Sequence, residues 1–427
     1  MPLPFRSANK LSSHTNPRKK ILYLVPRFPY PLIGGDRLKA YHLLRHLSET
    51  ADVDLIALDE WDSGHGANLT AICKLCNDVT VVPFHRSSAW WRVFKSFFTR
   101  QPVEYAWYDS PDMRKAVDLA LKRRRYDLVV SFFARTGIHS QNLRGTPKVL
   151  VAEDSRLLAQ ERAAKKFSFS PEYFVRLNDR KKLLTAEPEL MRKFDLVTFV
   201  ASPDEDRTLE LDPMINTGIL GNGVDLDLYK FRDSDRDDTI LFVGELSVYH
   251  NRMMAERIVA KVFPLVRKMS PTTKLIIAGS NPDSSLKKLI ARTPGAELHA
   301  NVEDIKPYYY GAKVFIHPQE IGAGIQNKLL EALALGTAIV TTPIGASGIA
   351  GLADTENCLI RTSDQELAQA AVDLLHDDSL RSSIAGNGRT LIEEYYSWNR
   401  IFRDCDKHIR AVAPDFFYES QPALATA

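Results

Sequence analysis

The chain has 427 residues, of which 44% are hydrophobic and 26% charged, and its formal net charge is only +3. This composition is typical of globular proteins, and the length predicts two or three domains. The near balance of charge argues against a general nucleic-acid binder, and no apolar run is long enough to span a membrane. The four cysteines include one C-x-x-C pair, too few for a zinc site, and their low number fits the reducing cytoplasm.

The first half of the chain alternates strand and helix patterns. Residues 1–19 are basic and lack an apolar core, so we expect a disordered N-terminus and no secretory signal. The region 20–217 follows, and its predicted strands are "KILYLVP" (20–26), "VDLIAL" (53–58), "VTVVPF" (79–84), "YDLVVSF" (126–132), "KVLVAE" (148–153) and "FDLVTFV" (194–200). This alternation predicts a parallel sheet with helices on both faces.

A second series of the same kind covers 239–378, after a linker over 218–238 that is rich in Gly and Asp. Its predicted strands are "TILFVGEL" (239–246), "TKLIIAGS" (273–280), "AELHA" (296–300), "AKVFIHP" (312–318), "TAIVTT" (337–342) and "NCLI" (357–360). Helices over 379–412 then close the chain before a flexible tail, 413–427. We therefore expect an α/β protein of two doubly wound, Rossmann-like domains that face a central cleft.

One stretch of the second series points to a ligand. Residues 322–336, "GAGIQNKLLEALALG", open an apolar helix on Gly-x-Gly and carry a lysine and a glutamate near its start. Phosphates favour helix N-termini, and glycine lets the backbone approach them closely. The alternative is a plain turn before a buried helix.

The second half resembles the retaining glycosyltransferases of family 4, which have the GT-B fold. The motifs that carry the resemblance are "NGVD" (222–225), "FVGEL" (242–246), "LIIAGS" (275–280), "GAGIQNKLLEALALGTAIVTTPIGASGI" (322–349) and "YYSW" (395–398). Within this family the chain looks most like the sugar transferases associated with exopolysaccharide and exosortase systems. The "PYP" and "GD" of residues 29–36 are a weaker part of the same likeness.

The resemblance implies a nucleotide-sugar site on this helix. Gly324 and Ile325 would turn backbone amides toward the donor, Glu331 would accept hydrogen bonds from the ribose, and Lys328 would face the diphosphate. The full set of implied donor-binding residues is Gly34, Gly35, Gly244, Asn251, Arg252, Gly324, Ile325, Gln326, Lys328 and Glu331. A surface lysine and a solvated glutamate are the alternatives for Lys328 and Glu331.

The chain departs from the family pattern at two places. Many members have a glutamate where this chain has Ala323, with Glu320 nearby. Many members also have an Arg–Lys pair after the first strand of the second domain, where this chain has "GELSVYHNRMMAE". Arg252 is the best candidate there for a diphosphate clamp.

The N-terminal half supplies the candidate catalytic residues. Gly34 and Gly35 of "IGGDR" would let a loop approach the donor, and Asp36 would begin a helix that faces the cleft. The "VAEDS" stretch carries Glu153 and Asp154 where many family members have a histidine. Either carboxylate could bind an acceptor hydroxyl, and the alternative for both is a helix N-cap. For the two glycines the alternative is an ordinary tight turn.

The segment 86–102, "RSSAWWRVFKSFFTRQP", has the composition of a helix that lies on an anionic membrane. Basic residues flank aromatic side chains at helical spacing, and the aromatic residues are Trp90, Trp91, Phe94, Phe97 and Phe98. A core helix of the first domain is the alternative.

The resemblance implies an enzyme that moves a hexose-type sugar, with retention, from a nucleotide-sugar to a saccharide or polyprenyl-linked acceptor. It implies no cofactor and no metal, and we interpret neither D-x-D pair (Asp52/Asp54, Asp225/Asp227) as a metal site. We expect a cytoplasmic protein, peripheral on the inner face of the membrane, that builds cell-surface polysaccharide and binds no nucleic acid. The alternatives are another GT-B activity, such as a sugar-nucleotide epimerase, and a degenerate GT-B module that binds without turnover.

Overall fold

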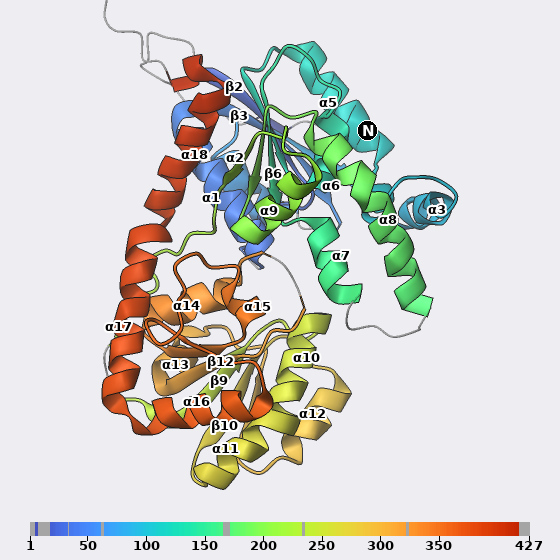
Figure 1. Ribbon diagram of the computed structural model, residues 1–427. Helices are drawn as coiled ribbons and strands as arrows, with labels where there is room; N and C mark the ends of the chain where they lie inside the picture. The colour runs from blue at the N-terminus through green and yellow to red at the C-terminus, as the bar shows by residue number, and fades with distance from the viewer. Residues whose placement is uncertain are drawn as a thin grey trace, which may run out of the picture. The chain divides into compact units, whose positions relative to one another are not determined.

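The chain forms two compact units in the computed structural model, which describes residues 5–6, 18–32, 34–60, 64–164, 171–232, 235–321 and 324–417 (Figure 1). The first unit runs to Val200, resumes over Asp204–Leu220 and takes up the chain again from Phe402. The second unit comprises Gly221–Ile401 together with Ala201–Pro203.

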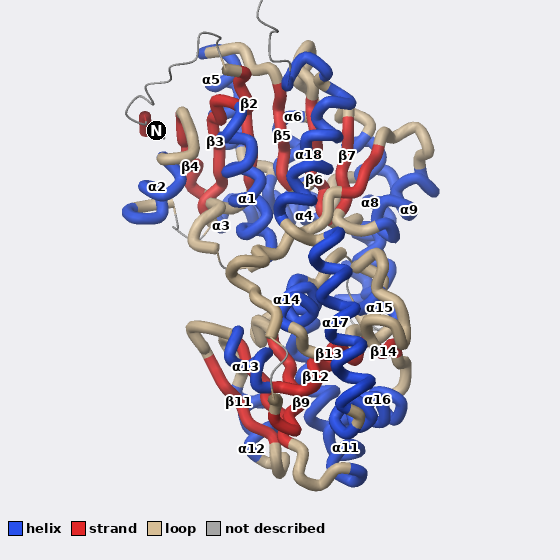
Figure 2. The backbone as a smooth tube through the Cα atoms, turned by 90° about the vertical axis from the view of Figure 1, so that its left-hand side faces the viewer, coloured by secondary structure: helices blue, strands red, loops and turns tan. Residues whose placement is uncertain are grey.

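The first unit is built on an eight-stranded sheet of order β1-β4-β3-β2-β5-β6-β7-β8 (Figure 2). All strands are parallel except β1, which pairs antiparallel with β4. The strands are β1 (Phe5–Arg6), β2 (Lys19–Val25), β3 (Ala51–Asp59), β4 (Asp78–Pro83), β5 (Leu128–Phe132), β6 (Lys148–Glu153), β7 (Leu196–Phe199) and β8 (Thr217–Ile219). The run Ile21–Val25 is fully buried, as expected for a central parallel strand with helices on both faces.

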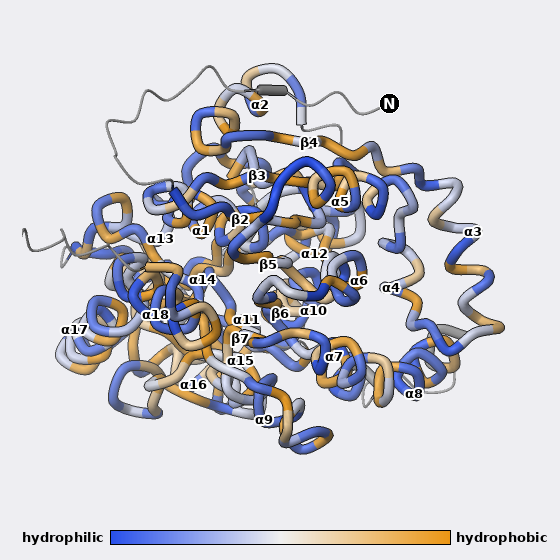
Figure 3. The backbone as a smooth tube through the Cα atoms, turned by 90° about the horizontal axis from the view of Figure 1, so that it is seen from above, coloured by the Kyte–Doolittle hydropathy of each residue, from blue (hydrophilic) through white to orange (hydrophobic). Residues whose placement is uncertain are grey.

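Helices alternate with the strands of this unit, and α3 lies at its edge. The helices are α1 (Gly35–Thr50), α2 (Gly66–Cys73), α3 (Arg86–Ser96), α4 (Val103–Tyr108), α5 (Pro111–Arg123), α6 (Ala134–Ser140), α7 (Arg156–Ala164), α8 (Pro171–Met191), α9 (Ser202–Leu211), α18 (Trp398–Val412) and the 3₁₀ turn η2 (Pro414–Phe417). Figure 3 shows α3 next to α4 and α8 at the edge of the unit. Of the segment predicted to be helical over 86–102, only Arg86–Ser96 forms a helix, α3, and Pro102 is the N-cap of the next helix, α4.

The second unit has a six-stranded parallel sheet of order β11-β10-β9-β12-β13-β14. Its strands are β9 (Asp237–Val243), β10 (Lys274–Gly279), β11 (Ala296–Ala300), β12 (Ala312–His317), β13 (Ala338–Thr341) and β14 (Leu359–Ile360). Its helices are α10 (Tyr249–Arg257), the π-helical turn η1 (Ile258–Val262), α11 (Phe263–Met269), α12 (Ser284–Ala291), α13 (Lys306–Gly311), α14 (Asn327–Leu335), α15 (Pro343–Ala346), α16 (Asp364–His376) and α17 (Asp378–Tyr395).

Both faces of this sheet are covered by apolar side chains, which explains its hydrophobic strands. Ile240 and Phe242 of β9 belong to one buried cluster, whereas the intervening Leu241 belongs to another with Leu330 of α14. Alternate residues of a strand point to opposite faces, so β9 contributes to both clusters. The prediction of two doubly wound α/β domains is confirmed.

Several predicted boundaries differ from those of the structure. The N-terminal stretch predicted to be disordered includes strand β1, and the predicted linker 218–238 loses its ends to β8 and β9. The strands β1 and β8 were not predicted, because two and three residues are too few to form a recognisable hydrophobic pattern. The second unit continues past 378 to Ile401, and the predicted tail contributes η2 to the first unit.

Candidate functional site

The strand order of the second unit reverses direction between β9 and β12, which makes this position the candidate ligand site. The chain proceeds from β9 to β10 and β11 on one side, and from β12 to β13 and β14 on the other. Adjacent strands whose connections leave in opposite directions create a crevice at their carboxyl ends, where α/β proteins bind ligands. Gly244 follows β9 at this edge, and Pro318 follows β12.

Glycines shape the backbone of this edge. Gly324, before α14, has φ 70°, which favours glycine, and a Cβ on Gly348 would lie 2.3 Å from the Gly324 carbonyl oxygen. Asn222 of the "NGVD" motif donates from Nδ2 to Oδ1 of Asn327, the first residue of α14, at 2.7 Å. The family motifs 222–225 and 322–349 therefore meet at the start of α14.

Glu331 and Lys328 lie one turn apart on α14 and are both half-buried. Burial raises the pKa of Glu331 to about 7, which Lys328 partly counteracts. Burial also lowers the pKa of Lys328 to about 8. The Tyr309 hydroxyl lies 3.1 Å from the Lys328 carbonyl oxygen and 3.5 Å from Oε2 of Glu331, so it fixes this carboxylate.

Lys328 reaches across the crevice to the element that follows β9. Its ammonium donates to Oδ1 of Asn251 on α10 and lies 5.6 Å from the centre of the Phe242 ring. Gly244 makes this approach possible, since a Cβ there would lie 3.1 Å from the Asn251 side chain. Asn251 also donates to the Glu245 carbonyl oxygen at 3.0 Å.

Two histidines beside Lys328 are held neutral. Burial, with the charge of Lys328, lowers the pKa of His250 to about 4. The fully buried His317 at the end of β12 has a pKa well below its usual range for the same reasons. At neutral pH the positive charge of this group therefore belongs to Lys328.

Arg252, the predicted diphosphate clamp, is paired with an acidic residue. Its guanidinium donates to Oδ2 of Asp283 at 3.0 Å, and Asp283 is the N-cap of α12. Glu320 is paired with Arg257 at 3.2 Å on the wall of a pocket of about 250 Å³ between α10 and the loop after β12. Ala323, the position where the family glutamate is missing, lies outside the described residues.

In the first unit, charged residues gather at the corresponding edge of the sheet, between β2 and β5. Asp36, in the first turn of α1, pairs with Arg27 after β2 at 3.1 Å and lies 3.9 Å from Arg135 after β5. Arg135 also lies 3.6 Å from Glu104. Gly34 is the N-cap of α1 with φ 91°, and Gly35 is the first helical residue, so the "IGGDR" stretch is a glycine turn into α1.

The two acidic residues of "VAEDS" have different surroundings. Glu153 is buried and its Oε1 lies 2.6 Å from the ammonium of the buried Lys39, which also donates to the Leu220 carbonyl oxygen. Its φ of 72° follows an irregularity in the pairing of β6 with β7. Such strain in a residue other than glycine is concentrated at functional sites. Asp154 pairs with Arg156 at 3.3 Å.

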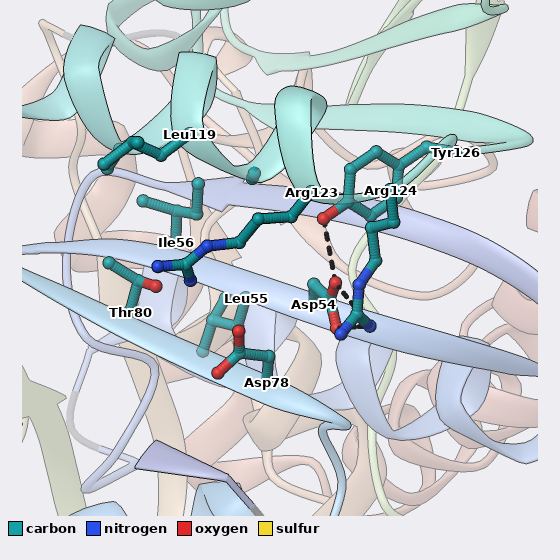
Figure 4. Close-up of a pocket in the computed structure, with 11 residues that line it drawn as sticks. Asp54, Leu55, Ile56, Asp78, Thr80, Leu119, Arg123, Arg124 and Tyr126 are labelled. Carbon is teal, nitrogen blue, oxygen red and sulfur yellow. Dashed lines mark hydrogen bonds and ion pairs between the residues drawn. The ribbon is translucent and has the colours of Figure 1, made fainter. Parts of the chain in front are cut away.

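A second charged pocket lies at the opposite, amino-terminal edge of the first sheet (Figure 4). Asp54 there accepts hydrogen bonds from the Tyr126 hydroxyl at 2.8 Å and from Arg124 at 3.1 Å. In Figure 4, Arg123 reaches along the same pocket toward Thr80. Since the carboxylate of Asp54 is already satisfied and the pocket is at the wrong edge for the crevice, we assign the Asp54 cluster to structure.

The structure thus brings together Gly244, Asn251, Lys328 and Glu331, with Gly324, Ile325 and Gln326 leading into α14, while Arg252 is directed to α12. Sequence reasoning missed Asn222, His250, Tyr309 and His317. Only Asn222, through its place in the "NGVD" motif, gave a signal. Among the described residues no helix is both long and apolar enough to cross a membrane.

Comparison with known proteins points to glycosyltransferases. Residues 237–377 match the family model "Glycosyl transferases group 1". A 44.6 kDa protein from the cps region of Klebsiella pneumoniae is 25% identical over 399 residues, covering 90% of this chain and 98% of that protein. The capsular polysaccharide biosynthesis glycosyltransferase CapM of Staphylococcus aureus is 26% identical over 150 residues, covering 34% of this chain and 39% of CapM.

Solved structures with the same architecture include HepE of Anabaena in complex with UDP-glucose. That match has a TM-score of 0.63 at 18% identity and covers 92% of this chain and 99% of that one. Sucrose-phosphate synthase of Thermosynechococcus elongatus matches with a TM-score of 0.67 at 17% identity, covering 92% and 99%. These likenesses show the fold, which is GT-B as predicted.

Proposed function

We propose, from the premise that this chain is a glycosyltransferase of group 1 with the GT-B fold, that it transfers a hexose from a UDP-sugar during synthesis of a capsular or exopolysaccharide. The family prediction is confirmed, whereas the narrower exosortase-associated subgroup stays a prediction. The choice of UDP is supported by the complex of HepE with UDP-glucose, and the polysaccharide by CapM and the Klebsiella cps-region protein.

The observation that carries the proposal is the Lys328–Glu331 pair at the start of α14. We propose that Glu331 accepts hydrogen bonds from the ribose hydroxyls, with Tyr309 holding its carboxylate in place. The Gly324–Gln326 backbone and the positive end of the α14 dipole would face the diphosphate.

Departure of the nucleotide is the step that needs assistance. As the bond from the anomeric carbon to the diphosphate oxygen breaks, negative charge builds on the leaving group. We propose that Lys328 counters this charge. Both histidines beside it are neutral, so Lys328 carries the positive charge of this group. A bound diphosphate would raise the pKa of Lys328 from about 8 and keep it protonated.

We propose that transfer proceeds with retention, without a metal ion or cofactor, and that a saccharide or a polyprenyl-linked saccharide is the acceptor. The resemblance to family 4 supports retention. Asp36, Glu153 and Asp154 remain the candidates for contact with the reacting sugar or the acceptor; the strained backbone at Glu153 favours a role for this stretch.

We further propose that the protein acts in the cytoplasm, on the inner face of the membrane. The described cysteines are all free, as in proteins of a reducing compartment. A lipid-linked acceptor would be presented at that membrane surface.

The donor site is tested by calorimetry with UDP-glucose on the wild type and on Glu331→Ala. Loss of charge-assisted hydrogen bonds should weaken binding by roughly 10- to 100-fold. Glu394→Ala, an exposed glutamate of α17, is the matched control and should bind as the wild type does.

Equal affinity of Glu331→Ala and wild type would exclude the ribose role. A folded wild type that binds none of the UDP-, GDP-, ADP- and dTDP-sugars would instead favour the degenerate GT-B module. The degenerate module is the second candidate function because Arg252, the expected diphosphate ligand, is paired with Asp283.

A further inference from the structure

The aromatic residues of the α3 region face outward. Trp90, Trp91, Phe94, Phe97 and Phe98 are 65%, 58%, 54%, 44% and 80% exposed. The side chains that α3 buries are the small Ala89, Val93 and Ser96. A core helix would have the opposite arrangement, with its aromatic face inside. The alternative of a core helix is therefore contradicted, and we call these five residues the aromatic surface.

Polar contacts to α4 and α8 hold α3 in place. The Arg92 guanidinium donates to the carbonyl oxygens of Ala106 and Trp107, each at 3.0 Å. From α8, the Lys182 ammonium donates to the Ser96 carbonyl oxygen at 2.6 Å. Because α3 is anchored through its backbone and its inner face, the exposed rings are available to a partner.

Three of the exposed rings form a ladder. Trp91 stacks on Phe94 with ring centres 5.5 Å apart, and Phe94 meets Phe98 edge to face at 5.6 Å. Separately, Trp90 packs edge-on against Trp107 of α4. Exposed apolar side chains that adjoin one another on a protein surface mark an interaction site.

The charges around the ladder decide which partner fits. Residues 86–102 contain four basic residues and no acidic one. Arg92 is turned inward, but Arg86, Lys95 and Arg100 are exposed, and the Lys95 ammonium lies 5.3 Å from the centre of the Trp91 ring. Indole rings with basic side chains beside them suit the boundary between acyl chains and anionic headgroups.

We infer that the aromatic surface inserts into the headgroup region of an anionic lipid bilayer and anchors the first unit there. The rings would enter the acyl boundary, while Arg86, Lys95 and Arg100 contact lipid phosphates. The inference specifies the surface behind the proposed membrane location and depends on the proposed function only for the lipid-linked acceptor.

The test is flotation of the full chain, without any sugar nucleotide, with phosphatidylglycerol-containing vesicles or with vesicles of phosphatidylcholine alone. The wild type should float with the anionic vesicles, with a blue shift of its tryptophan fluorescence, and much less with the neutral ones. Trp91→Ser/Phe98→Ser should lower the partition coefficient at least tenfold on anionic vesicles. Met214→Ser, an 86% exposed apolar residue of the same unit, is the matched control and should bind as wild type.

The charge contribution is measured separately. Lys95→Gln/Arg100→Gln should lose about thirtyfold in binding to anionic vesicles and little in binding to neutral ones. Equal binding of wild type and Trp91→Ser/Phe98→Ser, or no binding of the wild type, would overturn the inference. A wild type that dimerises in sedimentation velocity, with a monomeric aromatic variant, would assign the surface to a second copy instead.

Failure here is distinct from failure of the proposed function. Calorimetry with UDP-glucose on Trp91→Ser/Phe98→Ser should give the wild-type affinity, because the aromatic surface belongs to the first unit and α14 to the second. A variant that binds UDP-glucose but not vesicles supports both proposals. A wild type that binds vesicles but no sugar nucleotide overturns only the donor site.

Discussion

At the scale of single residues, Lys328 and Glu331 have pKa values that burial moves toward each other. Glu331 titrates near pH 7 and Lys328 near pH 8 in the free protein. Below pH 7 the carboxylate gains a proton and loses acceptor capacity, and above pH 8 the ammonium loses its charge. The form with both groups ionised is therefore most populated between these values.

We predict a bell-shaped pH profile for the affinity of UDP-glucose. Binding should be strongest between pH 7 and 8 and fall up to about tenfold per pH unit on each side. UDP-glucose is the suitable probe because its diphosphate is a diester with no proton to exchange near neutral pH. Calorimetry from about pH 6 to about pH 9 measures the profile.

A separate variant tests which group causes the loss of affinity on each side of the pH optimum. Glu331→Gln should flatten the acidic limb and Lys328→Met the alkaline limb, each with weaker binding throughout. A wild-type affinity that is constant across the range would show that neither group titrates in contact with the donor.

The same residues show what a sequence reveals about a site. Glu331 and Lys328 were predicted because the family motif fixes their place on one helix. Tyr309 and His317 were missed because they come from α13 and β12, and only the folded sheet brings them to α14. The pairing of Arg252 with Asp283 was missed for the same reason, since the two residues are 31 positions apart along the chain.

At the scale of elements, β9 and β10 end in contact with each other. A Cβ on Gly279, at the end of β10, would lie 1.8 Å from the Gly244 carbonyl oxygen at the end of β9. Gly279 also has φ 158°, so both conformation and space require glycine there. This close packing fixes the loop after β9, which leads into α10. Asn251 of α10 contacts Lys328.

We predict that Gly279→Ala lowers the free energy of unfolding by about 2–3 kcal/mol and weakens UDP-glucose binding, because the strand ends must separate. The matched variant is Gly386→Ala in α17, where an added Cβ meets nothing within 4 Å. It should raise the free energy of unfolding by roughly 0.5–1 kcal/mol. Urea denaturation measures both, and similar stability of the two variants would refute the packing argument.

The length of a strand decided whether its sequence pattern predicted it. Strands with a hydrophobic run of five or more residues, such as β2 and β5, were predicted within about two residues. The strands β1 and β8 carry too few residues for a pattern. Periodicity marked the aromatic face of α3 but did not tell whether protein or solvent covers it.

At the scale of the whole molecule, the chain ends in the unit where it began. From Phe402 it belongs to the first unit, where Cys405, Ile409 and Phe416 are buried. The Phe402 ring stacks on His46 at 4.4 Å, and Asp406 accepts a hydrogen bond from His46 at 2.7 Å. The last helix is thus part of the first unit's stability.

We predict that deleting 402–427 destabilises the first unit by at least about 3 kcal/mol, or roughly 10 °C, while leaving the donor site intact. Scanning calorimetry should show a lower transition for the first unit, and UDP-glucose should still raise the transition of the second. Asp406→Ala should shift the same transition by less. If the deletion instead abolishes the response to UDP-glucose, the assignment of 402–427 to the first unit is wrong.

The sequence by itself determined the class of the molecule. Alternating strands and helices predicted two largely parallel sheets, and short motifs between residues 222 and 398 predicted the likeness to glycosyltransferases, because both are local patterns in which neighbours along the chain carry the information. The tertiary structure alone decided which charges are paired: Lys39 with Glu153, Arg252 with Asp283 and Lys328 with Asn251. It also decided that the aromatic surface is exposed. Pairing and burial depend on residues far apart in sequence, which only the packed sheets bring within hydrogen-bond distance or leave in contact with solvent.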